Sequence, residues 1–176
     1  DALDELARRA PAHRPGVMAI SYALGPALIA AIRRDACTDM AFIFGIGGFH
    51  DSRDVVRFFT TGHFRVPGES DWREAAPNEF GKWLFVIANA SRLRDDRDRY
   101  LLERIARARL HDRDAEIGDW FGRLGHDGRR VFDLVANNDP RHVDRLIGAL
   151  PREILAELDE LNPARQIGRA SCRARV

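Results

Sequence analysis

Ser21 is the residue whose place in the sequence points most directly to chemistry. It follows the apolar run 17–20 (VMAI), which is typical of a buried strand, and it precedes the apolar segment 24–32, whose spacing is that of a helix. A serine at such a turn holds its oxygen outward, and the amide N–H groups that follow it point at any negative charge that forms there. The sequence therefore predicts that Ser21 is a nucleophile.

The residues that flank Ser21 differ from the usual pattern of a nucleophile elbow, G-x-S-x-G. Ala19 and Ala23 stand at the two glycine positions, and Gly25 lies four residues beyond the serine. Glycine is favoured at such a turn because the flanking backbones come close together, so alanine makes the turn more crowded. A buried serine that opens an ordinary helix is the alternative interpretation of this stretch.

A second apolar run, 40–46 (MAFIFGI), follows the predicted helix. Two runs that are apolar on both faces and joined by a helix indicate a right-handed βαβ unit in a parallel sheet. The segment 47–51 follows the second strand, so it is expected at the carboxyl edge of the sheet together with Ser21. Sites in open α/β sheets lie beyond this edge. His50 and Asp51 are therefore candidates for a rim residue or a substitute acid or base. Alternatively, Asp51 caps the next helix and His50 only lines the rim.

Beyond residue 51 the sequence predicts helices and no further strand. The first helix starts at Asp51 or Ser52 and is ended by Gly62, and 66–71 is a loop. This switch from βαβ to consecutive helices is typical of a helical insertion on an α/β core. A broad apolar face is expected on the helix within 77–93, and the tryptophans are expected either to line an acyl pocket or to form the core of the insertion. The remaining predicted helices span 95–110, 112–124, 127–136, 139–150 and 151–161.

Composition excludes several classes of function. The 176 residues are 45% hydrophobic and 31% charged with a net charge of +1, which is ordinary for a globular protein and favours neither nucleic acid nor an anionic membrane as partner. The apolar stretch 16–32 is interrupted by Ser21, Gly25 and Pro26, which argues against a membrane span. Cys37 and Cys172 fit no disulfide framework or metal site, so we expect a reducing, cytoplasmic setting without metal or cofactor.

Three longer segments occur in a fixed order along the chain: AISYALGPALIAA (19–31), FGIGGFHDSRDVVRFFTTG (44–62), and NNDPRHVDRLIGALP (137–151) with LDELNPAR (158–165). Together they resemble a bacterial α/β-hydrolase family over most of the chain. The resemblance implies an α/β fold: a fragment of the hydrolase's parallel sheet (strand, elbow, helix, strand) followed by a mostly helical cap. It implies a partial core over 1–61, a cap over 62–161, and the start of a return to the core from 162.

The resemblance also implies a Ser…Asp…His triad in that chain order. Only Ser21 has a match in this sequence, with the N–H of Tyr22 as oxyanion donor; the Asp and His are expected outside the chain. The family acts on a small-molecule ester or related acyl bond, so the chain is expected to be a fragment of a serine hydrolase, nearly inactive as it stands. A hydrolase-like binding or scaffold protein without chemistry is the alternative, and a helical module in which both apolar runs are helices is a third interpretation.

Two further expectations concern the ends and the sheet. The last stretch, 166–176 (QIGRASCRARV), resembles the translation of a common sequencing adapter apart from Ala174, so we expect it to be an assembly artefact. Two or three strands of a larger sheet leave unpaired edges and an uncovered face, and we expect the isolated chain to associate.

Overall fold

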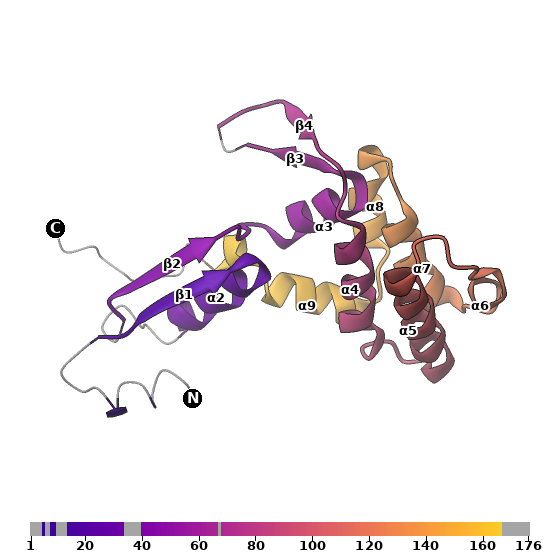
Figure 1. Ribbon diagram of the computed structural model, residues 1–176, viewed down its shortest axis with the longest axis horizontal. Coiled ribbons are helices and arrows are strands. Elements are labelled where there is room, and N and C mark those ends of the chain that lie inside the picture. Colours follow the sequence, from indigo (N-terminus) through magenta and orange to yellow (C-terminus); the bar gives the residue numbers. More distant parts are fainter. Residues whose placement is uncertain (1–4, 6–7, 10–13, 34–39, 67, 167–176) are drawn as a thin grey trace. The chain divides into compact units, whose positions relative to one another are not determined.

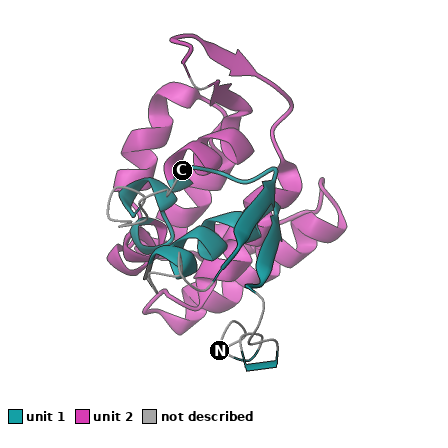
Figure 2. Cartoon of the chain, turned by 90° about the vertical axis from the view of Figure 1, so that its left-hand side faces the viewer, with its two compact units in different colours: residues 1–52, 159–176 teal, residues 53–158 magenta. Residues whose placement is uncertain are grey.

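The structure is a computed structural model that describes residues 5, 8–9, 14–33, 40–66 and 68–166 (Figure 1). Both cysteines and the tail beyond residue 166 lie outside the described residues. The chain divides into two compact units (Figure 2). Unit 1 is formed by residues 1–52 and 159–176, and unit 2 by residues 53–158. These bounds differ from the expected ones, which placed the start of the cap at residue 62 and its end at residue 161.

Unit 1 contains a parallel βαβ unit, as the two apolar runs predict. Strand β1 (Gly16–Ile20) leads through a 3-10 turn η1 (Ser21–Ala23) into helix α2 (Leu24–Arg33), and strand β2 (Phe42–Ile46) then pairs parallel to β1 (Figure 1). Each residue of β1 pairs with the residue 26 positions further on, from Gly16 with Phe42 to Ile20 with Ile46. The interpretation of both runs as helices is therefore wrong.

The two faces of this sheet differ in their surroundings. On one face α2 covers the strands: Ala19 is buried, and a Cβ at Gly45 would meet the side chain of Leu24. On the other face the apolar side chains of both strands are exposed within the described residues. The sequence predicts such an uncovered face for a sheet of two or three strands, and in the described part of unit 1 helix α2 covers only the opposite face.

Helix α3 (Ser52–Thr61) begins and ends as predicted. Gly62 ends it with a positive φ of 77°, and the buried hydroxyl of Thr60 donates to the carbonyl of Val56 over 2.8 Å. The prediction that no strand follows residue 51 is wrong. Strand β3 (His63–Arg65) and strand β4 (Trp72–Glu74) form an antiparallel pair around the predicted loop. Strands of three residues, mostly exposed, carry no apolar alternation that would reveal them.

Unit 2 is otherwise helical. Helices α4 and α5 pack against each other, and α7 packs on both. The prediction of a helix over 112–124 is wrong for most of that range, since only Gly118–Gly122 is helical there. Asp112 ends α5, and its carboxylate accepts the N–H of Asp114, which stabilises a turn in place of a helix start. No helix in the described part of the chain has the length and apolar character needed to span a membrane. The elements are α4 (Glu79–Ala90), α5 (Asp96–His111), α6 (Gly118–Gly122), α7 (His126–Ala136), η2 (Pro140–His142), α8 (Val143–Gly148) and α9 (Arg152–Glu160), followed in unit 1 by η3 (Pro163–Arg165).

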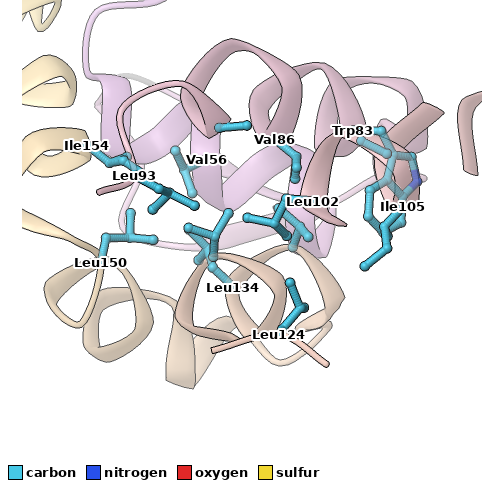
Figure 3. Close-up of a cluster of buried hydrophobic side chains, with 14 of the residues drawn as sticks. Val56, Trp83, Val86, Leu93, Leu102, Ile105, Leu124, Leu134, Leu150 and Ile154 are labelled. Carbon is cyan, nitrogen blue, oxygen red and sulfur yellow. The ribbon is translucent and has the colours of Figure 1, made fainter. Parts of the chain in front are cut away.

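The core of unit 2 is a cluster of buried hydrophobic side chains, mostly aliphatic, from α3, from these helices and from the segments that connect them (Figure 3). Val86, Leu102 and Ile105 are completely buried where α4 meets α5. The apolar face expected on α4 is narrower than predicted, since Phe80 and Leu84 are exposed. The other fully or nearly fully buried members include Val56, Leu93, Leu101, Val131, Leu134, Val135, Val143, Ile147 and Ile154.

Candidate active site

Ser21 adopts a strained backbone conformation at the end of β1. Its φ of 54° is positive, and among the described residues no other residue apart from glycine has a positive φ. The residue before it, Ile20, is extended, and Leu24 three residues later is already helical. A non-glycine residue in this region costs about 1–3 kcal/mol and persists only where its surroundings enforce it. The chain therefore reverses from strand to helix at the serine itself, and Ser21 is exposed.

Glycines in and just after strand β2 leave room for the start of α2, so the turn at Ser21 forms although alanines stand at the two usual glycine positions beside the serine. Leu24, the first residue of α2, packs where Cβ atoms at Gly45 and Gly48 would otherwise lie. A Cβ at Gly25 would lie 2.6 Å from the ring of Phe49, so this helix start and the loop after β2 are also in close contact. The close approach that G-x-S-x-G provides is supplied here by Gly25, Gly45 and Gly48.

The turn at Ser21 and the loop after β2 lie at the same edge of the sheet, as the sequence predicts. Ile20 and Ile46 are paired as the last residues of their strands. The rings of Tyr22 and Phe49 are 5.7 Å apart and tilted by 33°. Tyr22 is the second residue of η1 and follows Ser21 directly. The structure thus places the predicted oxyanion residue beside the predicted nucleophile, on the carboxyl rim.

His50 and Asp51 are held by the returning end of the chain. The side-chain amide of Asn162 donates to the carboxylate of Asp51 over 3.1 Å, and the N–H of Ala164 donates to the carbonyl of His50 over 2.9 Å. Asn162 is itself buried, and its Oδ1 accepts the N–H of Ala164. The segment around η3 therefore fixes the loop that follows β2, and Asp51 immediately precedes the first residue of α3.

The described residues show no base engaged with Ser21. No hydrogen bond joins its hydroxyl to any group in that part of the chain, including the rings of the described histidines. Nor do the described residues include a cluster of three or more histidine, cysteine or acidic side chains that would hold a metal ion. The site as described is thus a strained, exposed serine beside Tyr22, without an activating partner among the described residues.

Two of the three tryptophans take the second expected role, as part of the core of the helical unit. Trp83 is buried in the core of unit 2, and Trp120 packs against that core. Trp72 in β4 is exposed, with the guanidinium of Arg65 at 4.3 Å and that of Arg57 at 4.8 Å from its ring centroid. Sequence reasoning did not identify this pair of arginines, because the contacts depend on the unpredicted β3–β4 pairing.

Comparison of the chain with protein-family models, with characterised proteins and with solved structures found no match. The interpretation of the site therefore rests on its geometry. Sequence reasoning predicts that Ser21 lies at the carboxyl edge of the sheet, but it does not predict the hydrogen bond between Asn162 and Asp51. The only sequence signal for that bond is Asn-Pro at 162–163, which indicates a capped turn but not the distant residue that Asn162 contacts.

Proposed function

We propose that Ser21 is the nucleophile of a serine hydrolase of the α/β-hydrolase type, acting on an ester or related acyl bond. The observation that carries the proposal is the positive φ of Ser21 between a parallel strand and a helix. Strain of this kind clusters at functional residues. A serine held on such a turn presents Oγ above the rim of the sheet, which is the arrangement used for acyl transfer.

The proposed chemistry follows from these positions. Oγ of Ser21 attacks the acyl carbon while a histidine takes its proton, and the N–H of Tyr22 donates to the oxygen that becomes negative. The histidine then protonates the leaving alcohol, and water hydrolyses the acyl-enzyme in the second half of the cycle. In this proposal the histidine and its acidic partner come from outside the described residues. His50 and Asp51 on the same rim are the alternative source.

The test is covalent labelling of the protein translated from the complete reading frame. A fluorophosphonate probe should attach to Oγ of Ser21, with the adduct located by peptide mass spectrometry, and Ser21→Ala should abolish labelling. Ser70→Ala, an exposed serine in the loop between β3 and β4, is the matched control and should leave labelling unchanged. An unlabelled Ser21 in a folded protein would exclude the nucleophile role.

A second candidate, a non-catalytic binding protein with a hydrolase-like core, is favoured by one specific observation. No hydrogen bond reaches the Ser21 hydroxyl from the described residues, and an unactivated serine is a poor nucleophile. Removal of triad members lowers the rate by roughly 10⁴ to 10⁶.

The variant His50→Ala tests whether His50 is the base of the catalytic proposal. If His50 activates Ser21, this variant loses labelling, whereas a base from elsewhere leaves labelling intact.

A further inference from the structure

The returning end of the chain is tied to the loop after β2 at two successive residues. Asn162, which is 2% exposed, donates from its side-chain amide to the carboxylate of Asp51 over 3.1 Å. The backbone N–H of Ala164 is shared by the carbonyl of His50, at 2.9 Å, and Oδ1 of Asn162, at 3.0 Å. Asp51 immediately precedes α3 and Asn162 follows α9, so the tie lies at the two points of the sequence between which unit 2 is inserted.

The tied loop carries Phe49 onto the residue that follows the proposed nucleophile. The ring centroids of Phe49 and Tyr22 are 5.7 Å apart, and a Cβ at Gly25 would lie 2.6 Å from the Phe49 ring. Two glycines precede Phe49, and Gly47 has a positive φ of 64° with no atom within 4 Å of an added Cβ. Glycine gives the backbone many accessible conformations. The position of Phe49 therefore depends on the tie at the two residues that follow it.

We infer that Asn162 is a positioning residue for the reaction proposed at Ser21. By fixing the loop 47–51, its side chain holds the ring of Phe49 in place. That ring in turn packs on Tyr22, whose N–H is the proposed oxyanion donor. Such a donor is effective when it is fixed before the reaction, and loss of one donor lowers the rate by roughly 10²–10³. This inference deepens the proposed function and rests on it.

The same packing bears on the strain at Ser21. A positive φ at a residue other than glycine persists only where its surroundings enforce it. Phe49 contacts the turn at Tyr22 and the start of α2 at Gly25, so it is one of the contacts that hold this conformation. A loop released from Asn162 leaves the ring free to move. A displacement of about 1 Å at a reacting group can lower the rate by about 10²-fold.

Asn162→Asp separates this positioning role from the capping of η3. Capping uses only Oδ1, which accepts the N–H of Ala164, and a carboxylate oxygen accepts it equally well. The variant loses the donating amide and places a second carboxylate against that of Asp51, so repulsion replaces the tie. Asn78→Asp is the matched control, because Asn78 caps α4 through the same oxygen, 3.0 Å from the N–H of Gly81.

The test is the kinetics of fluorophosphonate labelling of Ser21 in the protein translated from the complete reading frame. Asn162→Asp should lower the maximal labelling rate constant, kinact, by at least about tenfold, because an oxyanion donor acts on the transition state. The half-saturating probe concentration, KI, should stay within about twofold of the parent value. Asn78→Asp should label like the parent.

Phe49→Ala tests the middle of the path and should also lower kinact by at least about tenfold. If Asn162 acts through Phe49, the two losses do not add, and the double variant should label no more slowly than the slower single variant. Hydrogen exchange of the β1 and β2 amides establishes whether the sheet is intact in each variant.

A parental kinact in Asn162→Asp or in Phe49→Ala, with the sheet intact, overturns the inference, as do losses that add in the double variant. If β1 and β2 lose protection in Asn162→Asp, Phe49→Ala decides: a parental kinact overturns the inference, and a lowered kinact with an intact sheet supports it. A parent protein that is not labelled at Ser21 overturns the proposed function together with this inference. A labelled parent with unaffected variants overturns the inference alone.

Discussion

The side chain of Leu24 occupies the space in which Gly48 would carry a Cβ. An added methyl group there would overlap the end of the leucine and lie 2.7 Å from its Cβ, which cannot swing away as a flexible chain end can. Leu24 is the first residue of α2, and Gly48 lies two residues beyond β2. This contact joins the start of the helix to the end of the neighbouring strand, directly beside the turn at Ser21.

Substitution Gly48→Ala should therefore weaken unit 1. Overpacking of this kind costs about 1–3 kcal/mol, and here it pushes α2 away from β2. All three tryptophans lie in unit 2, so their fluorescence does not report on unit 1. The measurement is amide hydrogen exchange of β1 and β2, which should become faster in the variant. Gly148→Ala, where an added Cβ meets no atom within 4 Å, is the control and should leave exchange in the strands unchanged.

The strain at Ser21 gives a prediction about stability that is independent of any substrate. Ser21→Gly should be more stable than Ser21→Ala by about 1 kcal/mol, because glycine adopts a positive φ without steric cost and alanine does not. Both variants lack the hydroxyl, so the comparison isolates the backbone. Slower exchange of the β1 and β2 amides in Ser21→Gly than in Ser21→Ala is the expected result. Equal exchange would mean that the positive φ carries no strain.

The sequence predicts the elements of unit 1 because the physical signals there are local. Two continuous apolar runs, 17–20 and 40–46, identify the strands, and the helical spacing between them identifies α2. The glycines against which the side chain of Leu24 packs belong to the segment FGIGG (44–48). By itself this segment predicts only the end of a strand, because nothing local says which side chain packs against the glycines.

The parts that sequence reasoning missed depend on contacts between distant residues. Asn162 and Asp51 are 111 residues apart, and no local pattern predicts their hydrogen bond. Strands β3 and β4 have three residues each, too few for an alternation to be read. The base proposed for the Ser21 hydroxyl cannot be predicted from the local sequence for the same reason, since it comes from elsewhere in the chain or beyond it.

Asp98 connects two helices of unit 2 through its carboxylate. It is 2% exposed on α5, and it accepts the N–H of Gly125 over 2.7 Å and that of Gly128 over 2.8 Å, at the start of α7. Asp98→Ala leaves two donors without their acceptor and should destabilise unit 2 by roughly 2–5 kcal/mol. Urea unfolding followed by tryptophan fluorescence measures this.

Two further substitutions test whether the carboxylate of Asp98 acts as that acceptor. Asp98→Asn retains one acceptor oxygen and should cost clearly less than Asp98→Ala. Asp96→Ala serves as control, because that side chain is 90% exposed, and it should change stability by no more than about 0.5 kcal/mol. Equal losses for Asp98→Ala and Asp96→Ala would contradict the role given to Asp98.

Lys82, the sole lysine of the sequence, lies buried on α4 as half of an ion pair. Its ammonium is 2.8 Å from Oε1 of Glu79 and 3.5 Å from Oδ1 of Asn138, and its side chain is 5% exposed whereas that of Glu79 is 33% exposed. When an apolar side chain of similar size replaces a buried ionic one, the charge is lost together with the cost of its desolvation, and the stability of the protein is often unchanged or higher. Lys82→Met should therefore change the stability of unit 2 by less than about 1 kcal/mol.

Removal of the carboxylate alone should have the larger effect. Glu79→Ala leaves the ammonium of Lys82 buried with only the amide oxygen of Asn138 near it, and should cost about 1–3 kcal/mol. In the double variant Lys82→Met with Glu79→Ala, most of that loss should disappear, because no buried charge remains to be compensated. Urea unfolding of the parent and the three variants completes the cycle. An additive double variant would show that the two side chains contribute independently and that the ion pair has no role in the stability of unit 2.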